Sequence, residues 1–393
     1  MNNTNEKIFD YPLFSLGFRA FFALAVLSAL VLITLWNGIF KGEIELKNYF
    51  QLTGWHAHEM LMGYTSAVIA GFLLTAIRNW TSQATLSGDQ LAGLCLLWLY
   101  GRIVPFYSGL LPDLMIAIID WAFLPVLIVS LVKPVLAARD RRSTLFLGLL
   151  LVMAIANTLI HVEQLGLADN VGHLGIQLLV YTIITMILVI AGIVFPFFTE
   201  KGLSGTMAIR SPVLDVLSVV SGVSIFVLQM LDIGGAVLII AVVAAVIANM
   251  LRIAGWYIHR IWYVPLLWIL YIGYGWIILG FVMVGLSAYG LIPAYLSMHA
   301  FAVGGIGVLT MGMMARVALG HTGRILKTSN VIALAFVLIN LSAFARVIMP
   351  AMLPDWYGQM LYLSTLCWLA AFSLFLYYYG PILAAPREDG KPG

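Results

Sequence analysis

The sequence is poor in charge and in cysteine. Only 9% of its 393 residues are charged, whereas 62% are apolar. Soluble domains average roughly a quarter charged and half apolar, so this composition excludes an ordinary cytosolic protein, a disordered chain and a collagen. The formal net charge of +3 is too small to suggest a surface that binds nucleic acid. The excess of apolar residues indicates a protein that lies in a lipid bilayer.

Several common signatures are absent. The two cysteines, Cys95 and Cys367, both lie in apolar runs, which favours small core residues over a disulfide or a zinc site. The sequence has no G-x-x-x-x-G-K-[ST] loop, no H-E-x-x-H helix and no C-x-x-C-H site. These absences argue against an ATP-driven pump and against covalently attached haem.

Long apolar runs dominate what is present. A hydrocarbon core about 30 Å thick requires roughly 20 apolar residues per helix. We expect twelve such helices, near residues 18–40, 55–77, 90–108, 113–136, 144–165, 172–198, 213–232, 234–254, 262–288, 292–318, 329–349 and 356–380. The fold class is therefore all-α, a polytopic membrane protein. A single transmembrane domain, 18–380, lies between an N-terminal segment, 1–17, and a C-terminal tail, 381–393. The first run lacks a small-residue cleavage site, which favours a retained helix over a signal peptide.

The positions of the lysines and arginines predict the orientation. With the N-terminus in the cytoplasm, the inner side holds 16 of the 20: Lys7, Arg19, Arg78, Lys133, Arg139, Arg141, Arg142, Lys201, Arg210, Arg252, Arg260, Arg316, Arg324, Lys327, Arg387 and Lys391. The outer side holds Lys41, Lys47, Arg102 and Arg346. This asymmetry agrees with the positive-inside rule, so we expect both termini in the cytoplasm.

Five of the seven histidines then fall in one outer layer, namely His56, His58, His161, His173 and His299. Ionisable residues in a membrane are costly and usually face the bundle interior, and imidazole is the commonest metal ligand. We therefore expect these five to ligate haem iron or another metal, although each could also sit in the interface bonded to water or backbone. His259 and His321 fall on the cytoplasmic side.

Helix geometry limits how the five can combine. His56 and His58 point about 200° apart on a regular helix, so they are expected to serve different centres. His161 and His173 can approach each other across their hairpin, whereas His299 must be brought in by tertiary packing. One haem plus one non-haem metal, or two haems, would fit this count.

Carboxylates and arginines share the outer layer. Glu59 is the candidate catalytic residue, which would handle protons or orient a ligand histidine. Asp113 is expected to cap a helix, while Glu163 and Asp120 also lie in this layer. Arg102 and Arg346 are candidate clamps for haem propionates, since the arginine fork suits carboxylates. Either arginine could equally snorkel to the interface or pair with Asp120.

Residues 55–82 and 297–323 follow a similar pattern. Each has an outer histidine, a glycine-rich middle and an inner arginine, and then Thr81 or Thr322. The pattern is too loose to establish a duplication by itself.

Two blocks resemble the NnrS family of bacterial membrane proteins. The first is Trp55-His56-Ala57-His58-Glu59-Met60, continuing through Ala70-Gly71-Phe72-Leu73-Leu74-Thr75-Ala76 to Asn79-Trp80-Thr81. The second is His299-Ala300-Phe301, continuing through Met311-Gly312-Met313-Met314-Ala315-Arg316-Val317-Ala318-Leu319-Gly320-His321-Thr322-Gly323-Arg324. Arg78 departs from the proline expected in the family. His321 matches a block yet lies on the cytoplasmic side, where it could orient a loop, pack with Arg316 or belong to a second site.

The resemblance implies haem, copper and bacterial resistance to nitric oxide. We therefore expect a protein of the bacterial inner membrane that holds one or two haem b groups, with copper or non-haem iron as a further metal. It would reduce nitric oxide to nitrous oxide with electrons from a quinol or a periplasmic protein. The alternatives are a transporter of a metal or haem, and a scavenger or sensor that binds nitric oxide without turnover.

Overall fold

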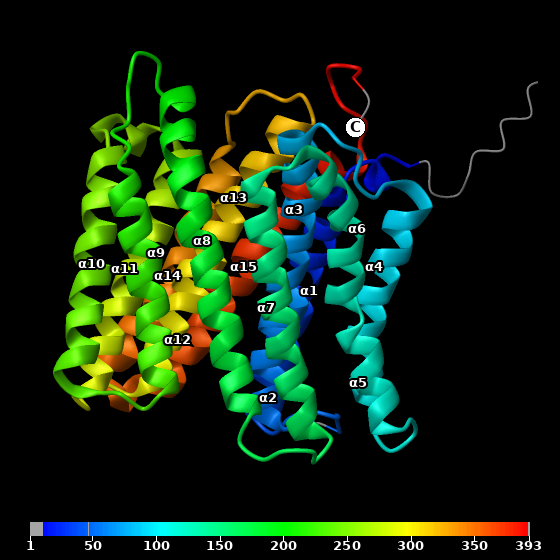
Figure 1. Cartoon of the computed structure of the whole chain (residues 1–393), viewed down its shortest axis with the longest axis vertical. Helices are drawn as coiled ribbons and strands as arrows, with labels where there is room; N and C mark the ends of the chain where they lie inside the picture. The colour runs from blue at the N-terminus through cyan, green and yellow to red at the C-terminus, as the bar shows by residue number, and fades with distance from the viewer. Residues whose placement is uncertain (1–10, 46, 392–393) are drawn as a thin grey trace, which may run out of the picture. The chain divides into compact units, whose positions relative to one another are not determined.

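A computed structural model describes residues 11–45 and 47–391, and in this part of the chain helices form almost all regular structure, with no strand (Figure 1). The α-helices are α1 (Gly17–Phe40), α2 (Leu52–His58), α3 (Ser66–Thr81), α4 (Gly88–Ile103), α5 (Asp113–Trp121), α6 (Phe123–Ala138), α7 (Arg141–Gln164), α8 (Gly172–Gly202), α9 (Pro212–Met230), α10 (Gly235–Trp256), α11 (Pro265–Ala288), α12 (Ala294–His299), α13 (Val308–His321), α14 (Asn330–Met352) and α15 (Tyr357–Ala384). Two π-helices, η2 (Glu59–Thr65) and η5 (Ala300–Gly307), lie between α2 and α3 and between α12 and α13. Short 3₁₀ turns are η1 (Pro12–Phe14), η3 (Val104–Tyr107), η4 (His259–Tyr263) and η6 (Pro354–Trp356). Lys7 and residue 46 lie outside the described residues.

The predicted all-α membrane architecture is confirmed. Within the described chain, 11 helical segments are long and apolar enough to cross a membrane. The remaining predicted span, near residues 90–108, corresponds to α4, which has 16 residues and continues into η3. The last helix runs on to Ala384 rather than ending at residue 380.

Contacts divide the predicted single domain, 18–380, into two compact units. Unit 1 consists of residues up to Leu179 together with Val317–Ile325 and the chain from Phe375 onward. Unit 2 consists of Val180–Arg316 and Leu326–Leu374. Each unit is described separately below.

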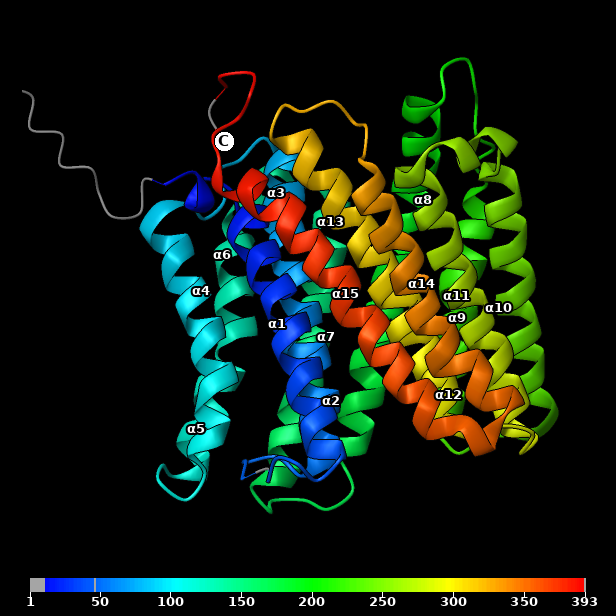
Figure 2. The ribbon, with the colours of Figure 1, turned by 180° about the vertical axis from the view of Figure 1, so that it is seen from behind.

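In unit 1, α1 lies along η2 and α3 (Figure 2). Gly71 of α3 permits this close packing, because a Cβ there would lie 3.0 Å from atoms of Phe21 and Phe22. Near the start of α1, Nη1 of Arg19 donates hydrogen bonds to the carbonyls of Leu383 at 3.0 Å and Ala385 at 2.6 Å. The two ends of the described chain therefore lie on one side, as an even number of crossings requires, and the asymmetry of lysines and arginines predicts that this side is cytoplasmic.

Unit 2 contains a buried arginine whose positive charge lies within a membrane-spanning helix. Arg252 of α10 donates from Nε to Asp215 at 2.8 Å and from Nη1 to Ser218 and Tyr274, both at 2.7 Å. Its Nη2 reaches the carbonyl of Leu188 at 2.9 Å. These bonds compensate the cation inside the bundle, so we assign Arg252 a structural role.

The spans formed by α2–η2–α3 and α12–η5–α13 have the same internal plan. In each, a short α-helix ends at a histidine, a π-helix follows at once, and an α-helix ends at or just before a threonine. Counted from His58 and His299, the same spacing relates Gly63 to Gly304, Gly71 to Gly312, Thr81 to Thr322 and Ser82 to Gly323.

Local geometry repeats with this spacing. The hydroxyl of Thr81 donates to the Ile77 carbonyl at 2.6 Å, and that of Thr322 donates to the Ala318 carbonyl at 2.7 Å. The residue after each threonine has a positive φ, 54° for Ser82 and 74° for Gly323. The matching spacing, hydrogen bonds and helix breaks of the two segments together indicate a structural repeat. The amino-acid sequence alone does not establish it.

Candidate metal centre

His58 lies at the end of α2, where the π-helix η2 begins. Its side chain is 0% exposed. Nε2 of His58 lies 3.1 Å from Oδ1 of Asn157 and 3.2 Å from Oδ2 of Asp120, while Nδ1 lies 3.2 Å from Oε1 of Glu59. The wider turn of a π-helix often marks a functional site, and here it directly follows the buried imidazole.

His161 approaches the same aspartate from α7. Its Nε2 lies 2.8 Å from Oδ2 of Asp120, and its Nδ1 lies 3.4 Å from the hydroxyl of Tyr49. Asn157 precedes His161 by one helical turn, so both side chains face α5. The Asn157 amide donates to Oδ2 of Asp120 at 3.1 Å. The carboxylate of Asp120 therefore lies at the centre of a cluster drawn from three helices.

His58, His161 and Asp120 form a group that could hold a metal ion, since one ligand atom from each lies within 4.8 Å of the others. All three side chains are buried. Two imidazoles and one carboxylate are the ligand set of many non-haem iron sites, and imidazole also suits copper. Ligands about 2.1 Å from a common ion lie roughly 3 Å apart, close to the spacing seen here. The donor set therefore fits a small transition-metal ion.

Each of these three ligands has a second partner that orients it. Glu59 contacts Nδ1 of His58, and Tyr49 contacts Nδ1 of His161. Arg102, from the end of α4, donates from Nη2 to Oδ1 of Asp120. Such outer partners set the ring orientation and tautomer of metal-ligating histidines.

Arg102 also bridges the two buried carboxylates. Its Nη1 donates to Oε1 of Glu59 at 2.8 Å while Nη2 holds Asp120. Of the three interpretations that the sequence allows, a propionate clamp, snorkelling to the interface or pairing with Asp120, the structure shows the third and adds Glu59. Both ring nitrogens of His58 face oxygen acceptors, which requires two N–H groups on the ring. The charges of Arg102 and His58 then balance those of Glu59 and Asp120.

Two side chains beside the cluster, those of Glu59 and Tyr49, carry groups that can hold a proton. Oε2 of Glu59 is buried and has no hydrogen-bond partner among the described residues. Tyr49 belongs to the loop before α2, and burial together with the Asp113 and Asp120 carboxylates raises the pKa of its hydroxyl well above the ordinary value. This hydroxyl therefore stays protonated at neutral pH and can donate toward His161. The role of Glu59 in proton handling stays a prediction.

The cluster does not fit a haem. A haem needs one ring nitrogen of its ligand directed into a flat cavity, whereas Nε2 of both His58 and His161 points at Asp120. The ring of Phe50 also stacks on His58 with 4.2 Å between centroids. We therefore derive no haem chemistry from these residues.

The other predicted ligands of unit 1 lie outside the cluster. His56 is half-buried and stacks on Trp36, with ring centroids 4.2 Å apart. His173 is exposed, and its Nε2 lies 2.9 Å from the amide of Gln177. Glu163 accepts a hydrogen bond from the Gly172 backbone N–H at 2.8 Å and so closes the α7–α8 hairpin. Asp113, the first residue of α5, is exposed.

His299 and Arg346 belong to unit 2. Nδ1 of His299 lies 2.7 Å from the carbonyl of Tyr295, and its Nε2 lies 3.1 Å from Nη2 of Arg346. The structure brings together His58 and His161, and places His299 with Arg346.

The two remaining histidines are His321 and His259. His321 lies at the end of α13 and packs on Phe18, with ring centroids 5.7 Å apart, while its carbonyl accepts a hydrogen bond from Arg387 at 3.0 Å. His259 is exposed.

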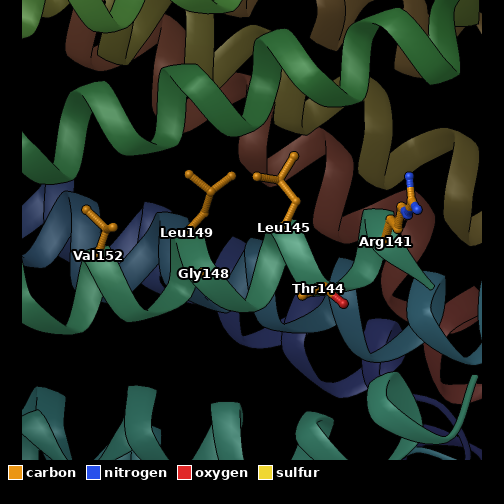
Figure 3. Close-up of a pocket in the computed structure, with 6 residues that line it drawn as sticks. All are labelled: Arg141, Thr144, Leu145, Gly148, Leu149 and Val152. Carbon is orange, nitrogen blue, oxygen red and sulfur yellow. The ribbon is translucent and has the colours of Figure 1, made fainter. Parts of the chain in front are cut away.

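Figure 3 shows a pocket on α7, lined by Arg141, Thr144, Leu145, Gly148, Leu149 and Val152. Its side chains are mostly apolar and come from the first half of the helix. At 1.5 Å per residue, Val152 is roughly 13 Å along the axis from His161. The pocket is therefore separate from the cluster of His58, Asp120 and His161.

Asn157 and Tyr49 were not found from the sequence. Asn157 lies four residues before His161, on the same helical face, and this spacing could have indicated it. Tyr49 lies in a loop and carries no such signal, because tertiary packing alone brings it to His161.

Comparison with known proteins identifies a family. A family model described as NnrS protein matches residues 12–387, nearly the whole chain. No curated protein matches the chain. The matched range contains every residue of the buried cluster and both π-helical spans, and the chain belongs to the NnrS family.

Proposed function

We propose that this membrane protein removes nitric oxide at a metal centre held by His58, His161 and Asp120. Membership of the NnrS family fits a role in the response to nitric oxide. The observation that carries the proposal is the convergence of two buried imidazoles on one buried carboxylate, each with an orienting partner. Copper or non-haem iron is the metal that we propose.

Bound copper or iron would supply a ligation site for nitric oxide and a path for single electrons. Nitric oxide is small and apolar, so it dissolves in a bilayer and can reach a site buried among transmembrane helices. We place this site near the periplasmic face of a bacterial inner membrane, following the charge asymmetry.

The proposed reaction joins two molecules of nitric oxide. Two electrons and two protons convert them to nitrous oxide and water, so that one N–N bond forms, one N–O bond breaks, and the released oxygen takes both protons. The electrons come from a quinol or from a periplasmic one-electron donor protein. Glu59 would accept a proton at its unpartnered Oε2 and pass it on during the reaction, and Tyr49 contacts His161 from the loop before α2.

The burial of the ligands favours a retained metal over a transported one. His58 and Asp120 are both 0% exposed, and each is held by several hydrogen bonds. Cargo of a carrier must leave its site in every cycle, which such enclosure would slow. A transporter of metal or haem is therefore the weaker alternative.

Optical spectra and metal analysis of the purified protein test the proposal. We expect stoichiometric copper or iron and a spectrum that changes when nitric oxide is added to the reduced protein. The His161→Ala variant should lose the metal, whereas His173→Ala, which alters an exposed histidine of the same hairpin, should retain it. Metal-free wild-type protein, or loss in both variants, would overturn the proposed site.

Two further measurements test whether the protein holds haem and whether it reduces nitric oxide or only binds it. Pyridine haemochromogen formation tests for haem b, which would have to be held outside the His58–His161 cluster. Gas analysis for nitrous oxide after addition of a reductant distinguishes turnover from binding alone. A nitrosyl spectrum without nitrous oxide would identify a scavenger or sensor.

A further inference from the structure

Unit 2 contains a counterpart of the His58–Arg102 arrangement. His299 ends α12 where the π-helix η5 begins, as His58 ends α2 before η2. Arg346 comes from α14, the helix that follows α13, as Arg102 comes from α4 after α3. Nη2 of Arg346 lies 3.1 Å from Nε2 of His299. The repeat therefore has a histidine and an arginine in both units, bridged by Glu59 and Asp120 in unit 1 and in direct contact in unit 2.

The acidic partners are absent from the second copy. Glu59 follows His58, whereas Ala300 follows His299. Asp120 lies 18 residues after the arginine it binds, and the same spacing from Arg346 leads to Ser364. Ser364 packs on α14, where its carbonyl accepts a hydrogen bond from Ser342 at 2.8 Å. No carboxylate pairs with Arg346 in the part of the chain that the structure describes.

The guanidinium of Arg346 is partly buried beside two tyrosines. Tyr295 and Tyr357 flank it, with ring centroids 5.8 and 5.5 Å from its central carbon. Nη1 is buried and has no hydrogen-bond partner among the described residues. Arg346 lies six residues before the end of α14, about 9 Å along the helix. Because this guanidinium is partly buried and its buried Nη1 donor is unused, an anion that accepts from Nη1 would stabilise it.

His299 does not supply the missing negative charge. Its Nδ1 must donate to the Tyr295 carbonyl, which lies 2.7 Å away, and its Nε2 accepts from Arg346. The ring in this arrangement is neutral, so the His299–Arg346 pair carries one positive charge. In unit 1 the corresponding arginine is compensated by Glu59 and Asp120.

We propose that Arg346 binds an exogenous planar oxyanion of carboxylate or nitrite size through its Nη1. The arginine fork matches a planar oxyanion, and the Tyr295 and Tyr357 rings flank the guanidinium. The ligand replaces the carboxylates that the other repeat carries in its own sequence. Its source is either a small free anion, such as nitrite, or a carboxylate on a larger ligand, such as a haem propionate. The site does not depend on the proposed metal centre.

Isothermal titration calorimetry on the detergent-purified full chain tests this site, with sodium nitrite and sodium acetate as probes. Arg346→Gln should raise the Kd at least about tenfold, as expected for loss of a charge-assisted hydrogen bond. Ala300→Glu restores the carboxylate found at Glu59 and should abolish binding by occupying Arg346 internally. Arg260→Gln changes an exposed arginine of η4 in the same unit and should leave the Kd unchanged.

The two sources give different results. A free-anion site binds nitrite in protein that is purified with or without haem. A propionate site binds nitrite only in haem-free protein, and Arg346→Gln then also loses haem. The proposal is overturned if wild-type protein binds neither probe in both preparations, or if folded Arg346→Gln binds as tightly as wild type. Because metal content at His58 and His161 is measured separately, failure here leaves the metal-centre proposal standing.

Discussion

Nε2 of His161 lies 2.8 Å from Oδ2 of Asp120, and this contact joins α7 to α5. Both side chains are buried, and the same oxygen lies 3.2 Å from Nε2 of His58. A transition metal that binds here must displace the protons that these nitrogens carry. Metal uptake should therefore release protons and weaken as the pH falls.

Replacing His58 or His56 should have opposite effects on metal content. His58 faces Asp120, while His56, two positions earlier, stacks on Trp36. We expect His58→Ala to lose the metal and His56→Ala to keep it, as measured by elemental analysis of purified protein. Metal loss in His56→Ala alone would contradict the assignment of the ligands.

Arg102 is expected to be essential for stability. Arg102→Gln would leave the buried Glu59 and Asp120 carboxylates without their shared cation, a change that costs about 3–5 kcal/mol. Arg102→Lys keeps one positive charge but cannot hold both carboxylates with a planar fork. It should therefore lose less stability than Arg102→Gln. Thermal unfolding followed by fluorescence measures both. As a control, Arg142→Gln removes an exposed charge and should leave the Tm nearly unchanged.

Gly304 is required for packing in the second repeat. A Cβ at this position would lie 2.5 Å from the Trp276 ring, which is too close for any real contact. Gly304→Ala should therefore lower the stability of unit 2 by about 1–3 kcal/mol. Gly54→Ala is the matched control, because nothing lies within 4 Å of a Cβ there. Equal Tm values for the two variants would show that the helices can separate without cost.

The C-terminal tail should remain attached except in strong acid. Hydrogen bonds from Arg387 to Asp389 lower the pKa of this carboxyl to about 2. Because the pKa is depressed, the contact contributes fully above the ordinary value near 4 and is lost as the pH falls through about 2. At pH 7, Asp389→Asn should expose the tail, and limited proteolysis should cut it faster than in wild type. Unchanged cleavage would mean that the remaining contacts hold the tail without Asp389: the hydrogen bonds to the His321 and Thr322 carbonyls and the Arg324–Glu388 ion pair.

Hydropathy alone was sufficient to place the membrane spans along the chain. It also predicted that both termini lie on the same side of the membrane. A span must bury about 20 consecutive apolar residues, and this requirement is local to each segment, so it can be read along the chain. The same argument located the outer histidine layer and singled out Glu59, Asp120 and Arg102 as polar residues at that depth. The contacts of His58 and Arg102 agree with that selection.

Tertiary structure decided which of those residues meet. Depth does not specify the direction in which a side chain points around its helix, nor which helices are neighbours. Hence periodicity separated His56 from His58 but could not tell which one faces Asp120, and it could not place Tyr49, which reaches His161 from a loop. The sequence by itself also left the two glycine-rich spans as a loose pattern. Their matching helix breaks show the repeat, and packing around Arg346 shows where one copy lacks the acids of the other.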